Sequence, residues 1–170
     1  MRISTAGRSN SAGFTLVEIA VVMLIIGVFT LATLPRLADF AGLRIDKDAH
    51  RIARTVAYLY AQAAARGQVV RLSFDLETGE YFPSVLNDED EFVQAAFPLF
   101  SGAALGGVTS VKSFTTAFHG AFKDEEAYLH FMPEGFAEEA VIVLGDRRGN
   151  AVSLTVDPLT GRTRITKGGA

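Results

Sequence analysis

The hydrophobic and polar positions of the chain follow three successive patterns. Residues 14–34 are almost continuously apolar, and a helix of that length spans roughly 31 Å, which matches the hydrocarbon core of a bilayer. A second helical stretch is predicted to follow and to end at Gly67. Its apolar residues recur at alternating steps of four and three, at Ile45, Ala49, Ile52, Val56, Leu59 and Ala63.

From Gln68 onward the apolar period changes to two, which is typical of half-buried strands. Residues 70–76 form the first predicted strand, and a short return strand begins at Tyr81 and is expected to stop at Pro83. The Gly- and Ala-rich residues 101–107 are expected to form a flexible connection. Further strands are predicted at residues 108–114, 128–131, 140–144, 151–156 and 162–166.

The residues that precede the apolar run do not fit an ordinary secretory signal. Residues 1–13 are basic through Arg2 and Arg8 and contain no acids. An ordinary signal has an apolar stretch of about 7 to 15 residues with a cleavage site after it, whereas this run is longer and contains Glu18. An unpaired carboxylate inside a bilayer costs on the order of a few kcal/mol. Glu18 therefore needs a partner, unless it snorkels to the membrane edge or stays protonated.

The sequence from Gly13 to Ile19 resembles the N-terminal signature of class III prepilins and type II secretion pseudopilins. The resemblance implies that a prepilin peptidase cleaves between Gly13 and Phe14 and that Phe14 is then N-methylated. It also implies an assembly role for Glu18, which the new amino group of Phe14 in a neighbouring subunit would neutralise. Pro35 lies where many pilins carry a proline, and we expect it to kink the assembly helix, with a plain membrane exit as the alternative.

Later segments are similar to the GspH/FimT group of minor pseudopilins and minor pilins, namely residues 66–75, 131–135 and 157–162, whereas residues 83–127 match nothing specific. With the N-terminal signature, they imply an α+β, pilin-like fold in which a long N-terminal helix packs on a mostly antiparallel β-sheet domain. The implied segments are a leader at residues 1–13, a transmembrane or assembly half of the helix at 14–34, an amphipathic half at 35–66 and a periplasmic β-rich domain at 67–170.

The function implied by the resemblance is that of a minor pseudopilin in a type II secretion pseudopilus, which assembles through its N-terminal helix and supports protein export across the outer membrane. The alternative is a FimT-like minor pilin of a type IV pilus. The implied partners are a prepilin peptidase, other major and minor pseudopilins or pilins, the inner-membrane assembly platform and the membrane. We expect a single-pass inner-membrane protein with a periplasmic C-terminal domain, located at a pseudopilus or pilus tip after assembly.

The charges that follow the apolar run oppose this orientation. The twenty residues after the run contain five basic residues, against two arginines in the leader: Arg36, Arg44, Lys47, Arg51 and Arg54. The positive-inside rule would place the downstream domain in the cytoplasm. We give the cleavage motif more weight than the charge count, so the periplasmic orientation rests on the resemblance.

Composition argues against catalysis. The chain has no Cys, which removes a disulfide framework, a thiolate metal site and a Cys nucleophile. His50, His119 and His130 lie in unrelated segments without metal-ligand spacing, and the adjacent acids Glu138 and Glu139 diverge on a helix or a strand. We therefore expect no enzyme, no cofactor and no metal site.

One acidic run, at residues 87–91, raises the question of calcium binding. It lacks the twelve-residue spacing of an EF-hand loop. We interpret it as a solvated surface loop, and the sequence leaves calcium binding open.

Arg162 and Arg164 introduce a second functional alternative, because a Gly-Arg-x-Arg end is similar to one that some pilus-type relatives use to bind DNA during uptake. On one strand the two side chains would share a face and contact successive phosphates. We favour a solvated edge strand whose cations discourage aggregation, because a net charge of -3 lacks the broad basic character of a DNA binder. Arg147 and Arg148 on the preceding loop keep the alternative open.

Overall fold

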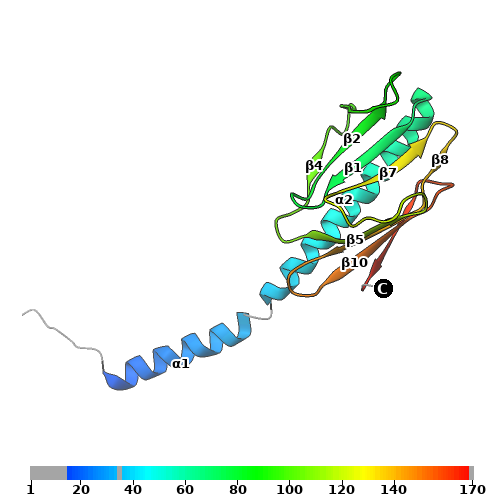
Figure 1. Cartoon of the computed structure of the whole chain (residues 1–170). Coiled ribbons are helices and arrows are strands. Elements are labelled where there is room, and N and C mark those ends of the chain that lie inside the picture. Colours follow the sequence, from blue (N-terminus) through cyan, green and yellow to red (C-terminus); the bar gives the residue numbers. More distant parts are fainter. Residues whose placement is uncertain (1–14, 34–35, 169–170) are drawn as a thin grey trace, which may run out of the picture. The chain divides into compact units, whose positions relative to one another are not determined.

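The computed structural model describes residues 15–33 and 36–168, with side chains for residues 15–30 and 44–168 (Figure 1). The chain divides into two units, Met1–Asp39 and Phe40–Ala170. The leader expected at residues 1–13, the methylation site expected at Phe14 and the kink expected at Pro35 lie outside the described residues. These three expectations remain predictions.

The first described element is α1, Leu16–Thr33, which covers most of the predicted apolar run. Its N-terminus is capped by the Thr15 hydroxyl, which accepts the Glu18 backbone N–H at 3.2 Å. The Thr30 hydroxyl donates back to the Ile26 carbonyl at 2.7 Å, so it satisfies itself within the helix. In the described parts of the chain, no helix combines the length and the apolar character needed to cross a membrane.

The second helix, α2, runs over Arg36–Arg66 and confirms the predicted apolar stripe. All six residues of that stripe are fully buried, at Ile45, Ala49, Ile52, Val56, Leu59 and Ala63. Gly67 ends the helix with a φ of 63°, and the next N–H, that of Gln68, donates to the Ala63 carbonyl at 3.3 Å. This hydrogen bond is the 6→1 bond of a Schellman motif, which requires a left-handed residue where the glycine stands.

The strands form two antiparallel sheets instead of the single sheet expected. The first sheet has the order β3-β2-β1-β7-β8, with β4 also paired to β2. Its strands are β1 (Val70–Asp75), β2 (Glu80–Leu86), β3 (Phe92–Gln94), β4 (Ala103–Ala104), β7 (Glu126–Met132) and β8 (Phe136–Ala137). The strands β3 and β4 come from the segment between residues 83 and 127 that matched no sequence pattern.

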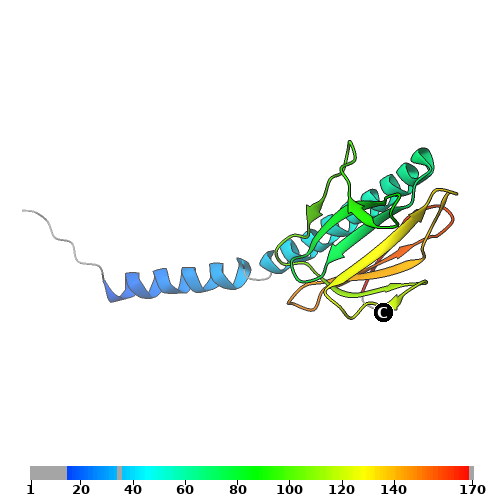
Figure 2. The ribbon, with the colours of Figure 1, turned by 45° about the horizontal axis from the view of Figure 1, so that its top comes forward.

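The second sheet has the order β11-β10-β9-β5-β6. Its strands are β5 (Ser110–Thr116), β6 (Gly120–Ala121), β9 (Ala140–Gly145), β10 (Ala151–Val156) and β11 (Thr163–Lys167). The register of β5 against β9 shifts between Val111 and Ser113, which marks a bulge. In Figures 1 and 2 both sheets lie on the same side of α2, so the helical stripe and the two sheets close over one core.

The strand β2 continues through Pro83, so the expectation that Pro83 stops it is wrong. The carbonyl of Pro83 accepts the Ala95 N–H at 2.9 Å, on the β3 side of the strand. In a strand the N–H and C=O of one residue point to the same edge. The missing N–H of Pro83 therefore faces the β3 side, where β3 ends at Gln94, and the ladder with β1 loses no donor.

Residues 101–107 are tethered, which corrects the expectation of a flexible connection. The Asp48 carboxylate on α2, only 6% exposed, accepts the Gly106 N–H at 3.0 Å. The neighbouring Arg51 donates to the Ala104 carbonyl. On the other side the Leu105 N–H donates to the Gly79 carbonyl at 2.9 Å. The loop thus joins the β1–β2 turn to α2.

Candidate assembly site

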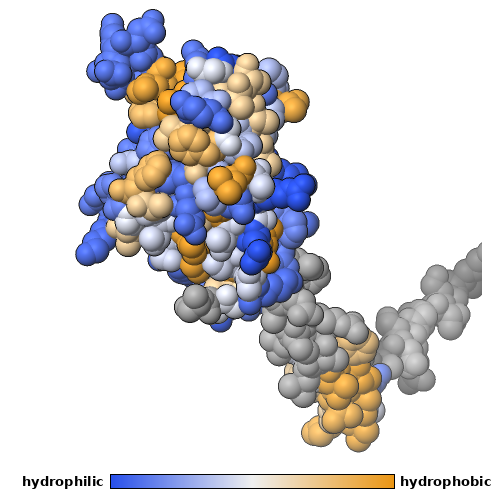
Figure 3. All heavy atoms as spheres, turned by 90° about the vertical axis from the view of Figure 1, so that its right-hand side faces the viewer, coloured by the Kyte–Doolittle hydropathy of each residue, from blue (hydrophilic) through white to orange (hydrophobic). Residues whose placement is uncertain are grey.

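The side chains of α1 present an apolar surface in every direction. Its large apolar residues from Leu16 to Phe29 are all exposed, by between 45% for Val22 and 87% for Leu16. Figure 3 shows the visible part of this helix as hydrophobic almost throughout. A helix that is apolar on all sides is stable when it is buried in lipid or among other helices. The described residues of α1 therefore need an apolar environment that another molecule supplies.

Glu18 is the single ionisable side chain of α1. It is exposed and lies in the first helical turn, where its carboxylate favours the positive end of the helix dipole. No basic residue lies within α1, so a cation that neutralises Glu18 must come from outside the helix. The cation expected from the resemblance, the amino group of a processed Phe14, lies outside the described residues, as does the cleavage position at Gly13.

The structure does not bring the two pairs of candidate DNA-binding arginines together. Arg164 lies on β11, an edge strand, and Arg162 directly precedes it; both are exposed. Arg147 and Arg148 lie in the β9–β10 turn, whereas Arg162 follows the opposite end of β10. The six residues of β10 therefore separate the two pairs of arginines by about 17 Å. The four cations therefore do not form one continuous basic patch.

The carboxylate of Asp157 further offsets the positive charge of Arg164. Hydrogen bonds from the Thr160 hydroxyl and N–H groups of the turn, together with the charge of Arg164, hold the pKa of Asp157 below its usual range. The carboxylate is therefore ionised at neutral pH and competes with any phosphate for the guanidinium.

Sequence reasoning missed a buried pair between His130 and Glu138. The His130 Nδ1 lies 3.0 Å from the Glu138 carboxylate, which is 1% exposed. The same carboxylate accepts the Phe118 N–H at 2.9 Å. No sequence signal identifies this pair, because the two residues lie on either side of the β7–β8 turn and Glu139 beside Glu138 is exposed.

The environment of Glu138 has opposing effects on its pKa. Burial raises the pKa of Glu138, but hydrogen bonds from His130, from the Thr116 side chain and from the Phe118 N–H together lower it below its ordinary value. The ionised carboxylate thus joins β7 to the β5–β6 turn. Within the described residues no group of three or more His, Cys, Asp or Glu side chains is arranged to hold a metal ion.

The conformation of the acidic loop at residues 87–91 is stabilised by hydrogen bonds within the loop. The Asn87 side-chain oxygen accepts the N–H groups of Glu89 at 3.0 Å and Glu91 at 2.8 Å. Residues 88–91 are exposed. The acids therefore point to solvent around an Asn-centred turn, as the expected surface loop requires.

Residues 8–34 match the prokaryotic N-terminal methylation motif. Together with the architecture of helix and antiparallel sheets, this motif gives the chain a type IV pilin-like N-terminus and fold. The motif implies processing by a prepilin peptidase, anchoring in the inner membrane before assembly, and assembly with other subunits of this class.

Two solved structures of the minor pseudopilin EpsH from the type II secretion system of Vibrio cholerae have a similar fold. The first superposes with a TM-score of 0.58 at 13% sequence identity, and the match covers 75% of this chain and 99% of that one. The second has a TM-score of 0.58 at 14% identity and covers 75% of this chain and 96% of the other. No curated protein matches this chain in sequence. The likeness to EpsH confirms the expected pilin-like fold.

Proposed function

We propose that this chain is a minor pseudopilin of a type II secretion pseudopilus. After cleavage between Gly13 and Phe14 and methylation of Phe14, α1 leaves the inner membrane and packs among the helices of other subunits, with the β-rich domain in the periplasm. Such assembly supports protein export across the outer membrane.

The observation that carries this proposal is the all-round apolar surface of α1 with Glu18 as its one ionisable group. A bundle of similar helices would bury that surface, but it would also bury Glu18, which is costly without a countercharge. The amino group of Phe14 in the adjacent subunit supplies the countercharge in the proposed assembly. The pairing therefore favours one axial offset between neighbouring helices.

Mass spectrometry of the N-terminal peptide from membranes of the native host tests the processing step. We expect the mature chain to begin at Phe14 and to carry one methyl group on its amino nitrogen. Material that begins at Met1, or that is cleaved near Ala32, would contradict the proposal.

The assembly step is tested with Glu18→Gln, which keeps the size of the side chain and removes its charge. We expect normal cleavage but strongly reduced recovery of the variant in pseudopili sheared from cells. Thr30→Ala is the matched control. It also removes a polar group from α1, but the Thr30 hydroxyl is uncharged and donates to the Ile26 carbonyl of the same helix. Wild-type incorporation of Glu18→Gln would show that the carboxylate has no part in assembly.

A second candidate is a FimT-like minor pilin of a type IV pilus, which the exposure of both Arg162 and Arg164 favours. Deletion of the gene separates the two candidates. Loss of protein export with normal DNA uptake and pilus formation supports the pseudopilin, and the reverse result supports the pilin.

A further inference from the structure

A row of polar side chains crosses the outer face of the first sheet. On β1 the side chains of Val70 and Leu72 are fully buried in the core, so Arg71 between them points to the opposite, outer face. Residues that lie directly opposite one another in an antiparallel pair share a face of the sheet. The register of β3, β2, β1 and β7 therefore places four polar residues side by side on this outer face, in the order Gln94, Ser84, Arg71 and His130.

The side chain of Arg71 is largely enclosed, yet it forms no hydrogen bond with any described residue. It is 19% exposed, and its one acidic neighbour within 4.0 Å among the described residues is Glu126, at 3.8 Å. That distance is too long for a hydrogen bond. The Arg71 guanidinium carbon lies 4.2 Å from the centre of the Phe92 ring and 5.1 Å from the centre of the Tyr128 ring. These cation–π contacts hold the cation and leave its N–H donors unused.

Buried polar atoms without a hydrogen-bond partner gather around Arg71. The described residues contain seven such side-chain atoms, and three of them lie on this face, namely the Arg71 Nε and the hydroxyl oxygens of Ser73 and Ser84. The two serines are 0% and 1% exposed. Each unpaired buried group costs about 1–3 kcal/mol, and such groups are rare in native proteins. The terminal nitrogens of Arg71 are not among the buried atoms, so a ligand can reach them.

Aromatic rings extend this site across the face. The rings of Phe92 and Tyr128 also contact His130, with centroids 5.4 Å and 5.2 Å away. Tyr128 in turn contacts Phe122 at 4.9 Å. All four rings are partly exposed. Tyr and Arg side chains in such settings contribute strongly to protein interfaces. The face thus combines a cation that has unused donors with apolar rings.

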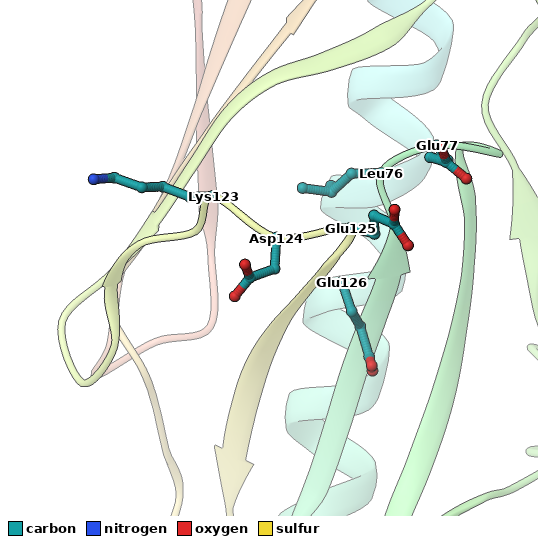
Figure 4. Close-up of a pocket in the computed structure, with 6 residues that line it drawn as sticks. All are labelled: Leu76, Glu77, Lys123, Asp124, Glu125 and Glu126. Atoms are coloured by element: carbon teal, nitrogen blue, oxygen red, sulfur yellow. The ribbon is translucent and has the colours of Figure 1, made fainter.

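The charges beside Arg71 favour a single carboxylate over an extended polyanion. Glu126 belongs to a group of four carboxylates at the end of the sheet, and Figure 4 shows the Lys123 ammonium pointing away from them. A nucleic acid that laid successive phosphates across this face would meet these carboxylates and be repelled. A single carboxylate needs only the guanidinium and displaces Glu126, whose side chain is 58% exposed. The four are Glu77, Asp124, Glu125 and Glu126.

We propose that this face binds a carboxylate of another protein, with an apolar side chain next to it. The carboxylate accepts hydrogen bonds from the terminal nitrogens of Arg71, because the planar guanidinium matches the geometry of a carboxylate. The apolar neighbour packs on the rings of Phe92 and Tyr128. Because these rings already hold the guanidinium, little side-chain freedom is lost on binding. We call Arg71, Phe92 and Tyr128 the carboxylate site.

The carboxylate site does not rest on the proposed secretion function. All three of its residues belong to the Phe40–Ala170 unit, and α1 contributes none of them. The site gives the β-rich domain a contact of its own with a neighbouring protein. That contact adds to the helix contacts of the proposed assembly.

Titration of the full-length chain in detergent micelles with benzoate tests the chemistry of the site, because benzoate joins a carboxylate to an aromatic ring. Nuclear magnetic resonance of the backbone N–H groups of β1 and β7 measures binding. We expect benzoate to shift these signals saturably and to bind roughly fivefold more tightly than acetate, which lacks the ring. Benzamide, which has the ring but no charge, should give no saturable shift.

Two substitutions separate the roles of the cation and the rings. Arg71→Lys keeps the charge but removes the planar guanidinium, and it should weaken benzoate binding roughly tenfold. Phe92→Leu keeps an apolar side chain but removes a ring, and it should abolish the preference for benzoate over acetate. Arg164→Lys, at an exposed arginine of β11, is the matched control and should bind benzoate as the wild type does. An unchanged dispersion of the N–H signals shows that each variant folds.

Photo-crosslinking in cells of the native host tests whether the site is used. A benzoylphenylalanine residue in place of the exposed Gln94 lies at the end of the polar row. We expect it to link to another protein through a peptide that contains Asp, Glu or a chain end. The yield of this product should fall roughly tenfold with Arg71→Lys and stay unchanged with Arg164→Lys.

Three results would overturn the proposal. These are equal binding of benzoate and benzamide, no saturable shift with benzoate up to roughly 100 mM, and a benzoate affinity that Arg71→Lys leaves unchanged. Tighter binding of inorganic phosphate than of benzoate would replace it with a phosphate ligand. A cross-linking yield that is independent of Arg71 would also contradict it. Cleavage at Gly13 is scored in the same cells, so loss of the contact in processed chains leaves the proposed function standing.

Discussion

Gly161 lies against the ring of Tyr60 so closely that a Cβ atom on Gly161 would come within 2.4 Å of the Tyr60 Cγ. The Tyr60 hydroxyl on α2 contacts the carbonyl of Gly135 and lies 2.8 Å from the carbonyl of Leu159. Tyr60 thus connects the helix to the turn before β8 and to the turn before β11. Gly161 has a φ of 62°, so both its conformation and its contact with Tyr60 favour a glycine.

Gly161→Ala is expected to lower the free energy of unfolding by about 2–4 kcal/mol, because a left-handed alanine costs about 1 kcal/mol and overpacking adds about 1–3 kcal/mol. Gly149→Ala is the matched control. It also has a positive φ, 87°, but no atom lies within 4 Å of its Cβ position, so only the conformational cost of about 1 kcal/mol is expected. Chemical denaturation of the two variants measures the difference, and equal losses would contradict the steric role of Tyr60.

Glu138 should make the stability of the domain sensitive to acid. Its pKa is lowered in the folded chain, so the unfolded chain binds the proton more readily, with a pKa of about 4.3. The stabilisation is therefore complete above about pH 4.3 and is lost as the pH falls from that value through the folded pKa. Denaturation of Glu138→Gln at several pH values should show a weaker decline over this range than the wild type shows.

Glu139→Gln is the control for this measurement, because Glu139 is the exposed neighbour of Glu138. It should keep the acid dependence of the wild type. Asp75, Asp146 and Asp157 also have lowered pKa values. Their contribution to the acid dependence is the same in the wild type, in Glu138→Gln and in Glu139→Gln. A Glu138→Gln variant with the wild-type pH profile would show that Glu138 does not contribute.

The two neighbouring residues Pro83 and Ser84 should differ strongly in how much stability a substitution costs. The Leu86 N–H donates to the Val69 carbonyl at 3.2 Å, so Ser84, two residues earlier, also directs its N–H toward β1. Ser84→Pro removes that donor from the ladder and should cost about 3 kcal/mol or more. Pro83→Ala should cost less than about 1 kcal/mol, because no β1 hydrogen bond involves its nitrogen. Thermal unfolding compares them, and a larger loss for Pro83→Ala would refute this account of β2.

Arg162 and Arg164 should not be needed for DNA retention if the chain is a pseudopilin. Reversal of both to Glu is expected to leave retention of duplex DNA unchanged at low salt, since the net charge is -3 and Asp157 is ionised beside Arg164. Reversal of Arg147 and Arg148 to Glu is the matched control at the other end of β10. A selective loss with the first variant, together with a salt dependence reduced by about one phosphate contact per arginine, would favour the pilin alternative.

Periodic features were predicted best. The six apolar positions from Ile45 to Ala63 repeat at the spacing of a helix, and all are buried. The strands now seen as β1, β5, β7, β9, β10 and β11 were also predicted to within a few residues. Each of these signals is contained in a short window of sequence, where the side-chain period of a helix or strand decides which face is apolar.

Interactions between distant segments were not predicted. The Gly106 N–H meets Asp48 across 58 positions of the chain, and this bond tethers residues 101–107. Pro83 is tolerated in β2 because β3 ends beside it, and the sequence of β2 does not contain that information. The ionised state of Glu138 likewise depends on groups that only the tertiary structure supplies.

The sequence alone determined the motif around Gly13 and Glu18, the apolar run and the stripe of α2, because each is a local pattern of residue types. Only the tertiary structure decided that the strands divide into two sheets, that His130 pairs with Glu138, and that residues 101–107 are tethered to α2. These outcomes depend on which distant side chains share a low-dielectric interior or a common surface, and one-dimensional spacing does not encode that.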